Sequence, residues 1–135
     1  MQHELPAISD AEWEVMTILW ADFPLTANEV VARLADRKDW NHRTVKTLLN
    51  RLVTKKALAF DTHGNRYLYR PGVQRDQCVR GKSRSFLDRV FGGAVGPMLT
   101  HFVNHSDLSQ EEIESLRRLL AAKSEKQSAR KGKNP

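Results

Sequence analysis

Apolar residues recur with helical spacing in three segments of the first 54 residues. Between 10 and 20 they occupy nearly every side of the helix, so this helix must pack on more than one neighbour. The segment 27–35 has a narrower stripe. In 42–54 the spacing i, i+3, i+4, i+7, i+8 defines one clean apolar face, formed by Val45, Leu48, Leu49, Leu52 and Val53. The pattern predicts three helices that share one core.

The starts of four helices are marked by capping residues. Ser9, Thr26 and Ser109 each precede a glutamate by three residues, which is the spacing of a capping box. Asn41 is placed to cap the helix that carries the clean apolar face. These signals fix where the chain enters each helix.

The apolar period changes after residue 57. Residues 58–62 and 66–70 flank the turn-forming stretch His63-Gly64-Asn65, and Pro71-Gly72 closes the segment. This pattern predicts a β-hairpin. Three helices and a basic-tipped hairpin within about 70 residues describe a winged helix-turn-helix, which we assign to residues 1–72.

The second half of the chain is predicted to be helical but has little core of its own. Stretches 74–91, 97–105 and after Ser109 carry apolar stripes on short helices, and the cheapest partner for such faces is a second copy of the chain. We therefore predict a mainly α protein with a small β-hairpin wing, residues 73–122 forming a helical dimerisation domain. The polar residues 123–135 are predicted to be a disordered basic tail. The predicted dimer contacts are Phe86, Val90, Met98, Leu99, Phe102, Val103, Ile113, Leu116 and Leu120.

The helix predicted from residue 42 has a one-signed polar face. Arg43, Thr47 and Asn50 point away from the apolar stripe, with Lys46 and Arg51 on its flanks, and no acid occurs between 42 and 56. Cations, hydroxyls and amides can bond base edges and phosphates, and a major groove admits such a helix. The plainer alternative is a solvated basic face, but that alternative does not explain the missing acids. This face predicts binding to double-stranded DNA.

The charge is unevenly distributed along the chain, whose formal net charge is +6. Residues 1–40 carry eight acids and three bases, whereas 41–70 carry seven bases and one acid. A basic segment beside an acidic one is typical of a polyanion-binding surface. Arg66 at the hairpin tip suits a phosphate or the minor groove, although the tip is otherwise an ordinary turn.

Other chemistry has little support in the sequence. The single Cys78 excludes a disulfide framework and is better explained as a small buried apolar residue. His101 and His105 have an i, i+4 spacing that can hold a metal, but no third ligand is nearby, so no cofactor is predicted. No catalytic motif is present, and we predict that the protein is not an enzyme. No apolar run is long enough to insert into a membrane and no signal peptide is seen, so a cytoplasmic protein is expected.

The motifs together resemble a known family of bacterial repressors. They are Ser9-Asp-Ala-Glu-Trp-Glu-Val-Met16 with Leu19-Trp20, Asp39-Trp40, Thr44-Val-Lys-Thr-Leu-Leu-Asn-Arg-Leu52, Gly64-Asn-Arg-Tyr-Leu-Tyr69, Phe102-Val103 and Asp107-Leu-Ser-Gln-Glu-Glu-Ile-Glu114. In this combination they resemble the BlaI/MecI/CopY, or penicillinase-repressor, family over residues 7–122.

The resemblance implies a homodimeric repressor bound to an inverted-repeat operator with a TACA/TGTA core. By position, the operator-reading helix would present Arg43, Thr44, Lys46 and Thr47. Asn50, Arg51 and Arg66 are supported only by the helix geometry and the hairpin. The family's β-lactam branch is inactivated when a membrane-sensor protease system cuts an Asn–Phe bond, and His101–Phe102 stands at the matching place.

Two further departures from the family pattern affect the interpretation. The copper branch ends in a cluster of cysteines that this chain lacks, so copper sensing by that route is not expected. The family's usual glycine after the Lys55-Lys56 pair is Ala57, which would disfavour a left-handed helix end at that residue. The alternatives left open are a metal-responsive repressor that uses His101 and His105, and a winged-helix adaptor between proteins.

Overall fold

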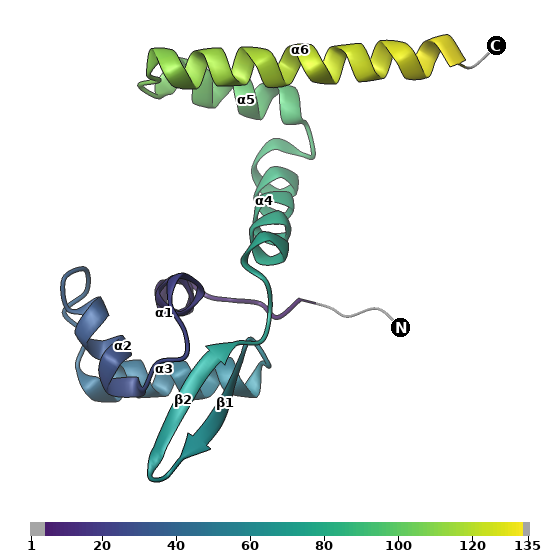
Figure 1. Ribbon diagram of the computed structural model, residues 1–135. Helices are drawn as coiled ribbons and strands as arrows, with labels where there is room; N and C mark the ends of the chain where they lie inside the picture. Colours follow the sequence, from purple (N-terminus) through teal and green to yellow (C-terminus); the bar gives the residue numbers. More distant parts are fainter. Residues whose placement is uncertain (1–4, 134–135) are drawn as a thin grey trace. The chain divides into compact units, whose positions relative to one another are not determined.

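The computed structural model describes residues 5–133 and divides the chain into two compact units, 1–85 and 86–135. The first unit holds three helices, a two-stranded hairpin and the start of a fourth helix (Figure 1). In chain order these are α1 (Asp10–Ala21), α2 (Ala27–Leu34), α3 (His42–Thr54), β1 (Leu58–His63), β2 (Arg66–Pro71) and α4 (Arg75–Phe91). This order is that of a winged helix-turn-helix, as the sequence predicted.

The boundary between the units lies inside α4 rather than after residue 72. The first half of α4 packs on the winged unit because it brings Cys78 into the core, where the side chain is only 5% exposed. Lys82 Nζ also donates a hydrogen bond to the carbonyl of Ile8, at 3.0 Å. Just before α4, Trp20 Nε1 donates to the carbonyl of Val73, at 3.0 Å. These bonds join distant sequence positions, which local patterns do not reveal.

The caps predicted from sequence are present. Ser9 and Thr26 accept hydrogen bonds from the amides of Glu12 and Glu29, and each glutamate accepts in return from the cap amide. Ser109 makes the same reciprocal pair with Glu112. Asn41 Oδ1 accepts from the amide of Thr44, at 2.9 Å. Each cap satisfies amides that the first turn of a helix leaves without partners.

The core of the winged unit is built around α1. Its side chains of Val15, Met16 and Leu19 are completely buried, and α1 packs against α2, α3 and β2. The stripe of α3 predicted from the sequence is buried too, with Val45, Leu49 and Leu52 fully enclosed. A helix with apolar residues on most sides is thus the centre of the unit.

The hairpin pairs antiparallel from Leu58 with Pro71 to His63 with Arg66. The two-residue turn between the strands begins with Gly64 at φ +63°, a conformation that glycine adopts without strain. Leu25 adds a bridge to Tyr69, with its amide donating to the Tyr69 carbonyl and the reverse bond at 2.8 Å. This bridge fastens the base of the wing to the segment before α2.

The end of α3 is a left-handed cap centred on Lys56, not on Ala57. Lys56 has φ +67°, its amide donates to the carbonyl of Val53, and the amide of Ala57 donates to the carbonyl of Leu52. This pair of bonds is a Schellman motif. Ala57 is the residue after the left-handed position, so it needs no positive φ and its buried methyl group packs in the core.

Gly72 holds the far end of the wing against the same cap. Its amide donates to the carbonyl of Ala57 at 2.8 Å, and a Cβ at Gly72 would lie 2.9 Å from the carbonyl oxygen of Lys56. Backbone therefore approaches backbone too closely for any side chain at this position. The base of the hairpin and the end of α3 are locked together.

A partly buried ion pair ties the start of α1 to the end of α3. Lys55 Nζ lies 2.6 Å from Glu12 Oε1 and also donates to the carbonyl of Ala7. Glu12 is 1% exposed, whereas the Lys55 side chain is 36% exposed. Burial raises the pKa of Glu12, but hydrogen bonds from Lys55 and Ser9 outweigh it, so the pKa lies below its ordinary value of 4.5.

The second unit contains the end of α4, then α5 (Val95–His105) and α6 (Gln110–Lys133). Within the described part of this unit, Leu87 is the one buried hydrophobic residue. Phe86 lies against Phe91 and Phe102, with ring centroids 6.0 and 6.2 Å apart. No other described helix of this unit packs extensively against α6. Most of the apolar side chains of this unit are therefore exposed to solvent.

Helix α6 continues where disorder was expected. It runs without a break to Lys133 (Figure 1), which corrects the expectation of a disordered tail for residues 123–133. Low apolar content excludes a core, but it does not exclude a single exposed helix. The stretch is rich in Ala, Lys, Glu, Gln and Arg, which lose little freedom in a helix. Residues 134 and 135 lie outside the described part.

The left-handed residue at the end of α3 gives a stability prediction. Lys56→Gly should raise the free energy of unfolding by about 0.5–1 kcal/mol, because glycine removes the strain of a positive φ. Urea denaturation of the full chain measures this. Lys56→Ala is the control, since it removes the charge but keeps a Cβ. An equal gain from both variants would contradict the backbone explanation.

The Glu12–Lys55 pair gives a prediction about pH. A carboxyl group with a lowered pKa contributes stability above its unfolded pKa and loses that contribution as pH falls through the folded pKa. Glu12→Gln should lower stability at pH 7 by about 1.5–3 kcal/mol, the range for a charge-assisted hydrogen bond. It should also flatten the stability loss of the wild type below about pH 4.5. Glu14→Gln, on the same helix, should do neither in urea titrations at pH 7 and pH 4.

Candidate nucleic-acid interface

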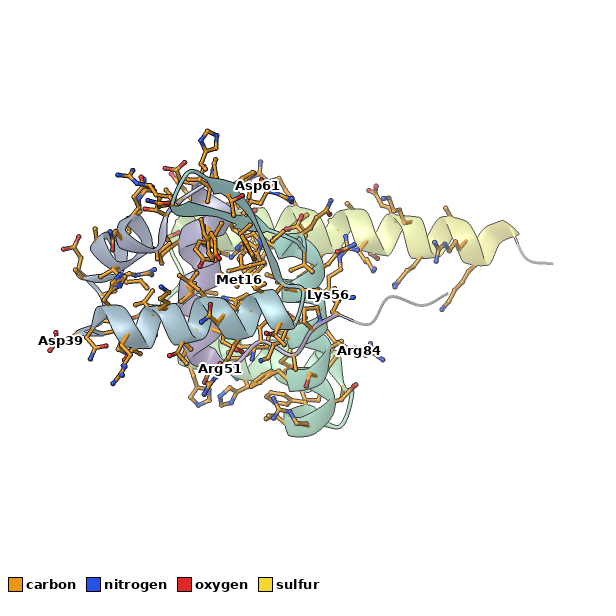
Figure 2. The ribbon with its side chains drawn as sticks, turned by 90° about the horizontal axis from the view of Figure 1, so that it is seen from below. Met16, Asp39, Arg51, Lys56, Asp61 and Arg84 are labelled. Atoms are coloured by element: carbon orange, nitrogen blue, oxygen red, sulfur yellow. The ribbon has the colours of Figure 1, made fainter. Side chains whose placement is uncertain are left out.

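The outward face of α3 displays the residues expected to read DNA. Arg43, Thr44, Lys46, Thr47, Asn50 and Arg51 are all exposed, and the helix contains no acid. The burial of its apolar stripe against α1 forces this face outward. Figure 2 shows α3 lying along one side of the winged unit, with Asp39 beyond its start and Lys56 beyond its end.

Two threonines on this face are already bonded to their own helix. Thr47 Oγ1 donates to the carbonyl of Arg43, and Thr54 Oγ1 donates to that of Asn50, both at 3.0 Å. The donor of each hydroxyl is therefore used. What each threonine presents outward is a methyl group and an oxygen that can accept. A methyl group suits contact with the thymine methyl in the major groove.

A polar groove of about 760 Å³ is lined by the start of α2, the side of α3 that faces the wing, and the tip of the wing. Lys46 and Arg66 both line it, so two predicted residues from distant sequence positions come together there. Several further polar residues line it that were not predicted as site residues. The lining residues are Thr26, Ala27, Asn28, Glu29, His42, Lys46, Asn65, Arg66, Tyr67 and Tyr69.

Three of the unpredicted polar residues, Asn28, His42 and Asn65, could bind a polar ligand. His42 is the first residue of α3, and its place on the helical wheel next to Lys46 was a usable signal. Asn65 is in the wing turn, where turn chemistry already explained an asparagine. Nothing local indicated Asn28, because it reaches the groove through the packing of α2.

Glu29 is the single acid among the groove residues, and its charge is engaged at the start of α2. Its carboxylate accepts from the amide of Thr26 at 2.9 Å. The backbone and hydroxyl hydrogen bonds with Thr26, with smaller contributions from Arg33 and Arg66, hold the pKa of Glu29 below its ordinary range. The groove therefore keeps a basic rim despite this acid.

Arg51 and the wing stand on opposite sides of α3. In Figure 2 Arg51 lies at one edge of the helix and Asp61, on β1 of the wing, lies beyond the other edge. Arg43, Thr47 and Asn50 occupy the middle of the face by helical spacing. The six predicted residues of α3 thus form a band with Lys46 at the edge near the wing and Arg51 and Thr44 at the other edge. Arg66 extends the band to the wing.

The second unit places its predicted residues on open helical faces. Met98 and Ile113 are half-buried, whereas Phe86, Val90, Leu99, Phe102, Val103, Leu116 and Leu120 are exposed. Val95 and Leu119, at 48% and 65% exposure, share these open faces and were not among the predicted contacts. His101 and Phe102 are exposed within α5.

The two histidines of α5 lie close together on exposed helix, and Cys78 lies in the core. The rings of His101 and His105 stack with centroids 4.4 Å apart, and His105 Nδ1 lies 2.9 Å from the carbonyl of His101. Across residues 5–133 no three His, Cys, Asp or Glu side chains gather to hold a metal. Burial raises the pKa of the Cys78 thiol, as expected of a core residue. None of the described helices combines the length and hydropathy needed to cross a bilayer.

Comparison with known proteins agrees with this geometry. The family model described as penicillinase repressor matches residues 8–122. The penicillinase repressor of Bacillus licheniformis is 36% identical over 117 residues, which cover 87% of this chain and 91% of that protein. The methicillin resistance regulatory protein MecI of Staphylococcus aureus is 33% identical, with 91% of this chain and all of the relative covered.

One solved structure supports the assignment of the winged unit. The DNA-binding domain of the repressor BlaI superposes with a TM-score of 0.50 and 35% sequence identity, covering 55% of this chain and 90% of that domain. The relatives are regulators rather than enzymes, as the sequence predicted. The winged fold and the outward basic face of α3 agree with the match of the family model over residues 8–122. The chain belongs to the penicillinase repressor family of transcriptional repressors.

Proposed function

We propose that this protein represses transcription by binding an inverted-repeat operator in duplex DNA as a homodimer. The observation that carries the proposal is the acid-free, exposed face of α3, which adjoins a basic groove closed by the wing. The likeness to the DNA-binding domain of BlaI supports the same role for this unit. An operator with a TACA/TGTA core is the proposed target, by resemblance to the family.

In this proposal α3 lies in the major groove. Arg43 and Asn50 in the middle of the band have the groups to read base edges, bidentate contacts being typical of Arg with guanine and Asn with adenine. Thr47 offers its methyl group to thymine. Lys46 and Arg51 at the edges, with Thr44, contact phosphates and fix the position of the helix. Arg66 at the wing tip contacts the flanking backbone or minor groove.

The open apolar faces of α4, α5 and α6 support the homodimer. Leu99, Phe102 and Leu116 leave between 41% and 45% of their side chains exposed to solvent. Apolar faces of this extent are typical of protein interfaces. A second copy offers identical faces, and a two-fold dimer matches the symmetry of an inverted repeat.

Proteolytic release is part of the same proposal. A cut between His101 and Phe102 would divide α5 and separate α6 from α4, so that each piece would keep only part of the dimer face. A membrane-sensor protease system is the proposed agent. Mass spectrometry of the protein from β-lactam-treated cells should then find a fragment that ends at His101. An intact chain under full induction would contradict this route.

The direct test of the function is fluorescence anisotropy with a labelled TACA/TGTA inverted repeat and a scrambled duplex of equal length. We expect binding to the repeat to be at least about 10³-fold tighter, with affinity falling steeply as salt rises. Equal weak binding to both duplexes would contradict the proposed operator. Absence of salt-dependent binding to any duplex would favour an adaptor between proteins instead.

The middle of the α3 band gives a prediction about specificity. Arg43→Ala should weaken operator binding by about 1–3 kcal/mol and relax the preference at one base position. Lys46→Ala should weaken binding to operator and scrambled duplex about equally, because it removes a phosphate contact. Anisotropy on both duplexes separates the two effects. Unchanged operator affinity in Arg43→Ala would refute its role in reading bases.

The apolar face of α5 gives a prediction about assembly. Leu99→Glu should convert the dimer to a monomer in sedimentation experiments and weaken operator binding, because a charge would be placed in the apolar contact. Asn104→Glu, on the opposite side of α5 by helical spacing, is the matched control and should leave the dimer intact. Dissociation by both variants, or by neither, would place the interface elsewhere.

A further inference from the structure

The last part of α6 extends beyond the segment that the family model matches. That match ends at residue 122, whereas α6 continues to Lys133. Residues 123–131 are all exposed, and no other described helix of the second unit packs extensively against α6. We define residues 123–133 as the helical extension. Its sequence contains five basic residues and one acid, Glu125.

The cations of the helical extension are concentrated on one side. Lys123, Lys126 and Arg130 have the spacing i, i+3, i+7, which places them on one face of a helix. Glu125 lies about 100° or more away from each of them at roughly 100° per residue. The same face carries Leu116 and Leu119 earlier in α6. The apolar stripe of this helix is therefore replaced by a basic stripe after residue 122.

This basic stripe is unfavourable in isolation. Lys123 and Lys126 are separated by three residues and Lys126 and Arg130 by four, and like charges at these spacings destabilise a helix by a few tenths of a kcal/mol each. The helical extension offers no i, i+4 pair of opposite charges to offset them. Two copies packed along this face would bring the cations together. An anionic surface, in contrast, would turn the repulsion into attraction.

We propose that the helical extension is a second DNA-binding element, which contacts the phosphate backbone of the duplex without reading bases. This inference rests on the proposed function, since operator binding by the winged units would hold the extension near DNA at high effective concentration. A phosphate contact needs only positive charge, and the three residues that define the basic stripe, Lys123, Lys126 and Arg130, all carry it.

Duplex DNA fits the helical extension better than a lipid surface does. A helix that lies in a membrane interface needs a broad apolar face opposite its cations. Between 123 and 131 the one apolar residue is Ala129. DNA carries one negative charge per about 1.7 Å of its axis and asks for no apolar contact. The charge pattern without an apolar face therefore favours DNA.

The test is the salt dependence of binding by the full chain. The first variant combines four substitutions, Lys123→Gln, Lys126→Gln, Arg130→Gln and Lys131→Gln. Glutamine is a good helix former, so the helix is kept. Anisotropy is measured on the operator duplex and on the scrambled duplex at several salt concentrations. The steepness of log K against log salt should fall by about 0.9 for each phosphate that the variant no longer neutralises. We expect a fall of at least about 1 on both duplexes, with the operator preference retained.

A matched variant separates a local effect from the effect of net charge. Arg75→Gln, Arg80→Gln, Arg89→Gln and Arg118→Gln remove the same number of exposed cations outside the helical extension. This variant should change the slope much less. Equal changes in the two variants would overturn the proposal, and so would an unchanged slope in the first variant. Circular dichroism should show that the helix content of both is kept.

Two further outcomes are informative. Wild-type binding to phosphatidylserine vesicles that is abolished in the first variant, with unchanged slopes on DNA, would assign the extension to a membrane surface and overturn the proposal. Failure of the wild type to prefer the operator over the scrambled duplex would contradict the proposed function instead. In that case the slope difference on the scrambled duplex still decides whether the extension contacts DNA.

Discussion

Burial of one face of α3 is the constraint on which the rest of the winged unit depends. Val45, Leu49 and Leu52 must leave water, and α1 offers the apolar surface that accepts them. Each fully buried side chain of this kind contributes about 1.5–3 kcal/mol. Only one rotation of α3 about its axis buries this apolar stripe against α1. The opposite, acid-free face is therefore exposed to solvent. Binding chemistry and folding are thus set by the same helical period.

The orientation of α3 is also fixed at both ends by polar contacts. Asn41 satisfies its first turn, and the Glu12–Lys55 pair ties its last residues to the start of α1. Part of the carboxylate of Glu12 is buried without a hydrogen bond among the described residues, since Oε2 has no partner. Such a pair contributes less to stability than its short distance suggests. Its value lies in holding α1 and α3 at one relative position.

Local patterns in the sequence were enough to predict the winged unit but not the details of its groove. The caps at Ser9, Thr26 and Asn41 and the apolar stripe of α3 depend on residues within a turn of one another, and these predictions are confirmed. Asn28 reaches the groove only through the packing of α2, which no local signal contains. The boundary inside α4 depends on a bond from Lys82 to Ile8, 74 residues away. The exposed helix at the end of α6 was not predicted, because a low apolar content excludes a core but does not exclude a helix built from residues of high helix propensity.

The turn of three residues between α3 and β1 has a mechanical consequence. Its centre, Lys56, is held in the left-handed region, and the backbone of Gly72, just after β2, approaches it closely. The helix α3 and the wing therefore cannot rotate independently, and the distance between them is fixed. A duplex whose local groove width does not match this fixed distance must itself deform in order to bind. In this way a rigid joint would let the protein sense the stiffness of a DNA sequence at positions that no side chain touches.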